Sequence, residues 1–352
     1  MMIPGPTDRA MSCNERPRQT SRDITRRSAA GRLTAFLVTG SWAGQAQSAD
    51  LPDWIRHGWP RTDFSRLSVP AAEIMSGGPP RDGIPAIDDP FFEPAVSATG
   101  QSPTEPVIGL VIAGDARAYP LRILLWHEIV NDVVGGIPVA VTYCPLCNAA
   151  LVFDRRTERG TLDFGVSGLL RHSDLIMYDR QTESWWQQFA GEAIAGQLTG
   201  VRLRALPVRV ESLVRFVERF PTGRVLVADP ARRKPYGRNP YVGYDTEHWP
   251  FLFKGDYEGP VPPLARVVSV GSDAWPLALL REKGRIEHGD LVITWTAGQS
   301  SPLDAAETDK GRDIGNVVAQ HRGAAGLVDV VHDLSFAFAF KALHPNGRIH
   351  VE

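Results

Sequence analysis

The hydrophobic positions of this 352-residue chain fall into short apolar runs separated by turns rich in glycine and proline. Residues 107–119 contain two such runs around Gly114-Asp115, which predicts a β-hairpin. Further strands are predicted at 139–143, 151–153, 161–166 and 175–178. Helical spacing is limited to 121–130 and to 210–220, where Pro221-Thr222-Gly223 ends the pattern. The pattern therefore predicts a strand-rich α+β protein.

Three short sequence motifs recur later in the chain in the same order. They are Ala118-Tyr119-Pro120-Leu121 with Ala274-Trp275-Pro276-Leu277, Val141-Thr142-Tyr143 with Ile293-Thr294-Trp295, and Phe220-Pro221-Thr222-Gly223 with His344-Pro345-Asn346-Gly347. Such recurrence predicts two related, duplicated mixed α/β units. The second unit is degenerate, because Thr296 and Gln299 stand where the first has Cys144 and Cys147.

The resulting plan has five segments. It comprises an export signal at 1–49, an irregular segment at 50–105 that packs on the core, the first unit at 106–230, a connection at 231–263, and the second unit at 264–352.

Residues 1–49 have the order of a secretory signal. A basic region with seven arginines precedes an apolar stretch at 33–42, and small residues follow up to Ala49. Thr25-Arg26-Arg27-Ser28 resembles a twin-arginine signal, although the usual Phe-Leu-Lys after the arginine pair is missing. The other interpretation is a disordered extension, with translation beginning at Met11. We expect a periplasmic or extracellular protein that is soluble after removal of the signal.

Composition narrows the possible functions. A net charge of −2, with 22% charged residues, argues against a nucleic-acid partner, and without residues 1–49 the charge becomes −6. No later stretch reaches the ~18 apolar residues of a membrane span. The sequence contains no P-loop, no G-x-S-x-G, no H-E-x-x-H and no dinucleotide fingerprint, so no nucleotide cofactor is expected. The partner is an unknown small molecule or a metal.

The cysteines carry the sharpest local signal. Of three, Cys13 lies in the predicted export signal, whereas Cys144 and Cys147 form the word Tyr143-Cys144-Pro145-Leu146-Cys147-Asn148. A two-residue spacer lets both sulfurs face one centre, as ligands of one ion or as a redox pair. In an oxidising compartment a structural disulfide is a third possibility. The spacing does not decide among these three.

Further ligands would have to come from nearby strands. His127 precedes the cysteine strand, His172 lies one hairpin later, and Met177 is a softer candidate for copper. Each also has an ordinary structural interpretation, as a core or surface side chain. His127-Glu128 with Asn131-Asp132 could supply a general base. A dense polar and aromatic stretch could line a pocket or form a structural corner; it contains Asp174, Tyr178, Asp179, Arg180, Trp185 and Trp186.

Several sequence motifs together resemble those of the bacterial and archaeal family catalogued as domain of unknown function 3179. They are Asp82-Gly83-Ile84-Pro85, Ala118-Tyr119-Pro120, His127-Glu128-Ile129-Val130-Asn131-Asp132, Thr142-Tyr143-Cys144-Pro145-Leu146-Cys147, Phe164-Gly165-Val166-Ser167-Gly168 and Met177-Tyr178-Asp179-Arg180-Gln181-Thr182. The resemblance covers about 82–230 and thins out afterwards. Asn148 stands where the family usually has glycine, and His172-Ser173 where an asparagine segment is common. The resemblance implies that His127, Cys144 and Cys147 belong together, and it implies no settled activity.

The sequence thus predicts an exported protein with a metal site at Cys144, Cys147 and His127, with His172 or Met177 as further ligands. Copper is the first expectation and zinc the second, in redox catalysis or metal carriage. One alternative is a dithiol oxidoreductase with Cys144 as the nucleophile and Cys147 as the resolving thiol. Another is a non-catalytic binding module in which the cysteines form a disulfide and Trp185-Trp186 face a ligand. Whether the protein is an enzyme stays open.

Overall fold

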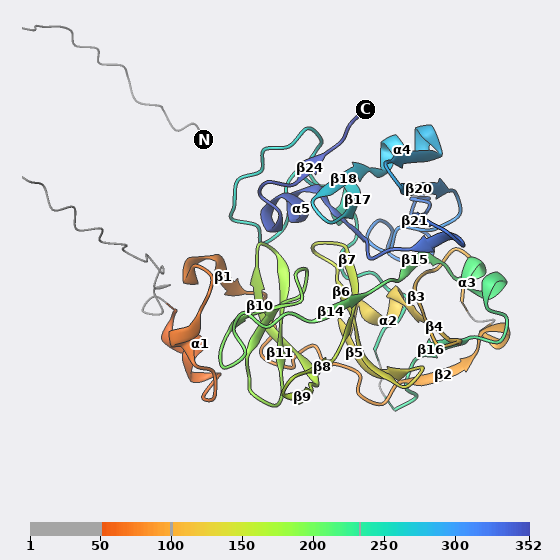
Figure 1. Ribbon diagram of the computed structural model, residues 1–352. Coiled ribbons are helices and arrows are strands. Elements are labelled where there is room, and N and C mark those ends of the chain that lie inside the picture. Colours follow the sequence, from red (N-terminus) through yellow and green to blue (C-terminus); the bar gives the residue numbers. More distant parts are fainter. Residues whose placement is uncertain (1–50, 99–100, 232–233) are drawn as a thin grey trace, which may run out of the picture. The chain divides into compact units, whose positions relative to one another are not determined.

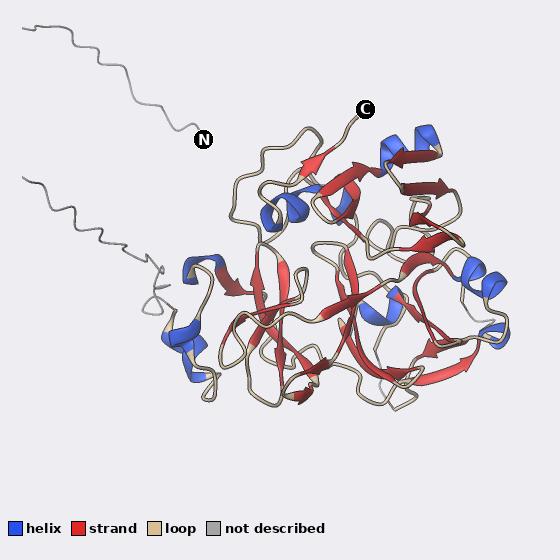
Figure 2. Ribbon diagram, in the orientation of Figure 1, coloured by secondary structure: helices blue, strands red, loops and turns tan. Residues whose placement is uncertain are grey.

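The computed structural model describes residues 51–98, 101–231 and 234–352. The predicted export signal at 1–49 lies outside these residues. About 40% of the described residues lie in strands and 14% in helices (Figure 2). None of the described helices combines the length and the apolar character needed to cross a lipid bilayer.

The strands form five small sheets, each named here after one of its strands (Figure 1). The β10 sheet has the order β1 (Ile74–Ser76), β10 (Phe164–Arg171), β11 (Asp174–Asp179), β12 (Trp185–Gln187) and β13 (Glu192–Ala195). The β6 sheet has the order β14 (Arg204–Leu206), β7 (Ala149–Asp154), β6 (Ile137–Cys144) and β5 (Ile129–Val134). The β3 sheet has the order β15 (Arg209–Ser212), β3 (Pro106–Ile112), β4 (Asp115–Pro120), β16 (Arg224–Val227) and β2 (Phe91–Pro94).

Two sheets come from the C-terminal part of the chain. The β17 sheet has the order β23 (Asp333–Phe336), β17 (Arg266–Val270), β18 (Asp273–Pro276) and β24 (Arg348–Ile349). The β20 sheet has the order β19 (Arg285–His288), β20 (Leu291–Thr296), β21 (Asn316–Gly323) and β22 (Gly326–Asp329). A two-stranded ribbon joins β8 (Arg156–Thr157) to β9 (Gly160–Thr161).

The predicted fold class is wrong. The described chain is a five-bladed, propeller-like arrangement of small sheets and not two mixed α/β units. The echoed words at Ala118-Tyr119-Pro120 and Ala274-Trp275-Pro276 lie in β4 and β18, and each of these strands has a parallel neighbour, β16 or β24. These likenesses do not make two α/β units, because the helices beside them are short and contribute little of the structure.

All five helices of the described residues are short, and the two that were predicted are shorter than expected because strands occupy part of each predicted stretch. They are α1 (Asp53–His57), α2 (Leu121–Leu124), α3 (Leu213–Arg219), α4 (Leu277–Lys283) and α5 (Ala337–Leu343), with 3-10 turns at Phe64–Arg66, Ala71–Glu73, Ala95–Ser97 and Tyr244–Thr246. The helix predicted at 210–220 begins only at Leu213, since β15 pairs with β3 before it. The helix predicted at 121–130 ends at Leu124, and β5 follows from Ile129.

One buried hydrophobic cluster connects the sheets. It includes Val141 of β6, Leu175 of β11, Phe336 of β23, and Tyr244 of the 3-10 turn Tyr244–Thr246, and each of these side chains is less than 9% exposed. Burial of this apolar surface fixes the ends of the β6 and β11 strands against one another and against β23. The candidate functional site lies at this junction.

Candidate metal centre

The two cysteines lie at the end of the β6–β7 hairpin. Cys144 is the last residue of β6 and pairs with Ala149, and Cys147 lies in the four-residue connection between them. Asn148 closes the connection with φ of 54°, in the left-handed region that glycine adopts most easily. Its Nδ2 donates to the Leu334 carbonyl of β23 at 2.7 Å. This contact holds the asparagine side chain in place at a position whose backbone conformation favours glycine.

A second hairpin end meets the first. His172 and Ser173 form the two-residue connection between β10 and β11, with φ of 54° and 63°. Positive φ at both positions is the requirement of a type I′ turn, which asparagine and glycine satisfy best. Cys144 Sγ lies 3.5 Å from the Ser173 carbonyl and Cys147 Sγ lies 3.9 Å from the His172 carbonyl. Asp174, the first residue of β11, is thereby placed beside both thiols.

Cys144, Cys147 and Asp174 form a group that can hold one metal ion. Their potential ligand atoms lie within 4.8 Å of one another, and all three side chains are buried. The cysteines are free thiols. Asp174 Oδ2 accepts hydrogen bonds from the backbone of Phe189 at 3.0 Å and from Gln187, whereas Asp174 Oδ1 is buried without a hydrogen-bond partner. An orphaned carboxylate oxygen beside two thiols is the donor arrangement that a cation would complete.

Burial dominates the electrostatics of this group. It raises the pKa of Asp174 to about 6 and that of the neighbouring Asp333 to about 7, and it raises the pKa of both thiols. The other main contributions come from hydrogen bonds and from the acidic members of the cluster itself, and none comes from a cation. At neutral pH both thiols therefore keep their protons, whereas Asp174 ionises above about pH 6. A bound cation would displace the thiol protons and pair with the carboxylate.

A small cavity reaches Cys144. It has a volume of about 60 Å³ and is lined by Glu128, Cys144 and Tyr241 together with apolar side chains that include Leu170 and Leu175. Glu128 has φ of 57°, and burial raises its pKa to about 8. Non-glycine residues with positive φ are uncommon, and they concentrate at functional sites. Glu128, Asn148, His172 and Ser173 all have this conformation near the thiols.

The structure does not bring His127 into this group. Its Nδ1 is 2.7 Å from the Pro85 carbonyl, and its Nε2 is 2.7 Å from the hydroxyl of Tyr236, on which the ring also stacks. His172 contributes its backbone near Cys147, whereas its ring pairs with Glu73 at 3.2 Å. Met177 is fully buried in β11 between strand partners Val166 and Trp186.

The predicted pocket residues form a corner of the β10 sheet. Tyr178 donates its hydroxyl to Asp82 at 2.5 Å, and Arg180 pairs with Asp88 at 2.9 Å. Asp179 accepts from the Trp186 indole nitrogen at 2.9 Å. Trp185 contacts the ring edges of Trp59 and Phe64. In the described part of the chain these side chains are engaged in packing and hydrogen bonds.

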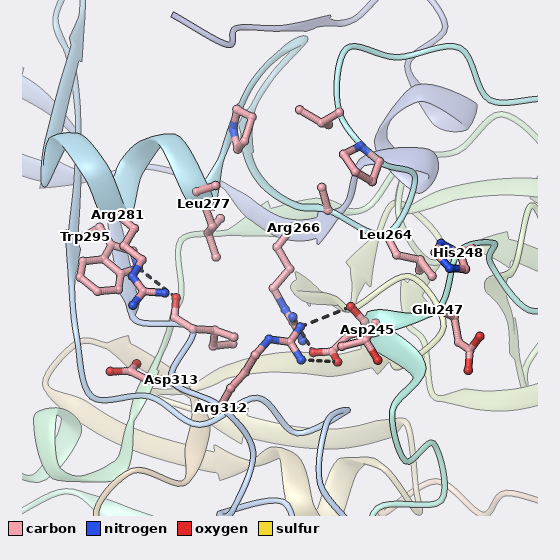
Figure 3. A pocket seen from close by; sticks show the side chains of 17 residues that line it. Asp245, Glu247, His248, Leu264, Arg266, Leu277, Arg281, Trp295, Arg312 and Asp313 are labelled. Carbon is pink, nitrogen blue, oxygen red and sulfur yellow. Dashed lines mark hydrogen bonds and ion pairs between the residues drawn. The ribbon is translucent and has the colours of Figure 1, made fainter.

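A larger cavity, of about 540 Å³, lies among elements of the C-terminal part, and the sequence did not reveal it (Figure 3). Leu264, Leu277 and Trp295 supply apolar walls, and Arg281 lies over the Trp295 ring. Asp245 is fully buried and pairs with Arg266 at 2.6 Å and with Arg312 at 2.8 Å. The volume of this cavity falls within the range of small-molecule binding sites.

Asp174 is the functional candidate that sequence reasoning missed as a ligand. Its signal was present, because a carboxylate directly before the apolar run Leu175-Ile176-Met177 is unusual at the start of a buried strand. Only the type I′ turn, however, shows that this carboxylate turns toward the cysteines.

The comparison with protein families agrees with the resemblance that the sequence motifs indicated. No curated protein and no solved structure matches the chain. A family model described as "Protein of unknown function (DUF3179)" matches residues 81–347, so the match extends well beyond residue 230, where the resemblance thinned out. The chain belongs to this DUF3179 family of proteins of unknown function.

Proposed function

We propose that the protein binds one divalent metal ion through Cys144, Cys147 and Asp174. The observation that carries the proposal is the orphaned, buried Asp174 oxygen beside two buried free thiols. An ionised Asp174 that is buried without a cation is costly, and a metal ion would pair with this carboxylate and with the two thiolates.

Zinc suits these donors better than copper. Thiolate sulfur and carboxylate oxygen are both ordinary zinc ligands, whereas copper(I) prefers thiolate and thioether donors. The carboxylate of Asp174 thus reverses the preference for copper that the cysteines and Met177 suggested. Zinc has no redox chemistry of its own, so metal carriage or acid-base chemistry follows rather than redox catalysis.

The cavity at Cys144 favours a catalytic role for the site. Three protein ligands with an open fourth position are typical of catalytic zinc, and zinc supplies an activated water there. Glu128 lines the same cavity, and its raised pKa lets it hold or release a proton near neutral pH. The proposed activity is a metal-assisted acid-base reaction on a substrate small enough to reach this cavity.

Elemental analysis of protein purified under reducing, chelator-free conditions tests the metal site. We expect the zinc content to fall by about one ion per chain in Cys144→Ser and in Asp174→Asn. His172→Gln is the matched control, because the His172 ring faces Glu73 and should not change the metal content. Metal-free wild-type protein that takes up no zinc on titration would refute the proposal.

The dithiol alternative has less support. A nucleophilic cysteine needs a lowered pKa and solvent access, whereas both thiols here are buried with raised pKa values. The segment after Cys147 enters β7 rather than a long helix. Turnover of a model disulfide that depends on Cys144 would favour this alternative instead.

We further propose that the chain is exported and processed near Ala49. The support is the order of basic, apolar and small residues at 1–49. N-terminal sequencing of protein from a cell fractionation tests this, and Arg26→Lys with Arg27→Lys should retain the precursor in the cytoplasm. Intact chains beginning at Met1 in the exported fraction would contradict it.

A further inference from the structure

A second group of metal-binding side chains lies in the C-terminal part of the chain. Asp273 begins β18, His288 ends β19, and His350 directly follows β24. Their potential ligand atoms lie within 4.8 Å of one another. None of these residues belongs to the thiol site.

The group is held by backbone contacts and by an aromatic wall. The His350 backbone donates to the Ala274 carbonyl at 2.8 Å, and β24 pairs in parallel with β18. The His350 ring stacks on Trp275 with centroids 4.9 Å apart and planes 11° apart. His288 meets the same indole at 5.5 Å. Trp275 is only 2% exposed, so both imidazoles pack against an indole that is itself held in the core.

The spacing suits a metal ion. His350 Nε2 lies 2.6 Å from Asp273 Oδ1, and the two rings have centroids 5.2 Å apart. Tetrahedral ligands at about 2.0–2.1 Å from zinc lie about 3.3–3.4 Å from one another, so small side-chain rotations bring the three donors to a common ion. The hydrogen bond between His350 and Asp273 would then give way to two metal bonds. His288 is exposed, so the remaining position is open to solvent.

We propose that Asp273, His288 and His350 form a second metal site, for a divalent cation of the imidazole-binding class represented by zinc. Two imidazoles and one carboxylate are borderline donors that zinc, nickel and copper(II) accept and that magnesium and calcium do not favour. Asp273 and His288 lie inside the family match and His350 lies beyond it, so the complete site depends on a residue outside the family's matched region.

Zinc titration of the full chain by calorimetry, in wild-type and Cys144→Ser backgrounds, tests this second site. We expect His288→Gln and His350→Gln each to weaken one zinc-binding event at least about tenfold in both backgrounds. His321→Gln is the matched control, because His321 is also a partly exposed histidine paired with an aspartate, Asp290 at 3.3 Å. It lies outside the Asp273 group and should leave zinc binding unchanged.

A second readout reports the location. Copper(II) bound to His350 should quench the fluorescence of Trp275. The loss of tryptophan fluorescence on adding copper(II) should therefore be smaller in Trp275→Phe and in His288→Gln, and unchanged in Cys144→Ser. Unchanged zinc stoichiometry and affinity in His288→Gln, or an equal loss in His321→Gln, would overturn the proposal. Failure of the thiol site alone would remove the Cys144-dependent binding and leave these results intact.

Discussion

Replacing Asp174 with asparagine should move metal binding and the stability of the metal-free protein in opposite directions. The amide keeps the shape of the carboxyl side chain, and its oxygen can still accept from Gln187 and from the Phe189 backbone. The substitution removes a buried carboxyl whose pKa is raised by burial from 3.8 to about 6. A raised carboxyl pKa means that ionisation costs stability as the pH rises from about 4 to about 6, and the full cost persists above that.

The magnitude follows from the pKa shift. The rise in the pKa of Asp174 from 3.8 to about 6 corresponds to about 3 kcal/mol of lost stability at pH 7.5, and Asp174→Asn removes this penalty. We expect the metal-free variant to unfold at a temperature about 5 °C above that of metal-free wild type. Zinc at one hundred times the Kd of the thiol site should add about 2.7 kcal/mol to the stability of wild type, and the variant should lack this contribution.

The assay is thermal unfolding under reducing conditions, with EDTA or with zinc. Asp163→Asn is the matched control, because the Asp163 carboxylate is about half exposed and pairs with Arg155. The control should keep the response to zinc. A metal-free Asp174→Asn protein that is less stable than wild type, and that gains as much stability from zinc as wild type does, would refute both the electrostatic argument and the ligand assignment.

Other predictions concern buried contacts outside the centre. Burial raises the pKa of Glu105 to about 7, so wild type should lose about 3 kcal/mol between pH 4.5 and 7, and urea unfolding of Glu105→Gln should show a flatter pH profile. Asn148→Ala should cost about 1 kcal/mol more than Asn148→Gly in the same assay, because both lose the bond to Leu334 but only alanine is strained at φ of 54°. Arg266→Gln should destabilise by about 3–5 kcal/mol because it leaves Asp245 without its buried partner, whereas the more exposed Arg312→Gln should cost less than about 1 kcal/mol; equal losses would contradict this ranking.

The sequence predicted the strands better than the architecture. The hairpin expected at 107–119 is β3 and β4, and the strand expected at 139–143 is β6. Both follow from local apolar runs and turn residues. The five-sheet arrangement depends on pairings such as β2 with β16 and β15 with β3, whose partners lie far apart in the chain. Apolar spacing over a few residues carries no information about such partners, so helical spacing at 210–212 gave way to strand pairing.

The sequence predicted only the part of the site that is local in the chain. Cys144 and Cys147 are neighbours in the sequence, so their spacing alone was enough to place two sulfurs near one centre. The third group comes from another sheet, and its position depends on a turn at His172-Ser173 that lacks the usual asparagine and glycine. His127 was a natural candidate by residue type. Its ring nitrogens instead engage Pro85 and Tyr236, contacts that only the tertiary structure reveals.

The destabilising features that cluster at the thiol site are themselves an argument for a bound ligand. Two hairpin ends place left-handed backbone at Asn148, His172 and Ser173, and Asp174 and Asp333 are buried with raised pKa values. Each of these features lowers the stability of the metal-free chain, and apolar residues with ordinary turn sequences would pack the same space at less cost. Packing alone therefore does not account for the group. A cation that binds only when both hairpins are in place would convert these costs into binding energy, which makes metal content and stability inseparable for this protein.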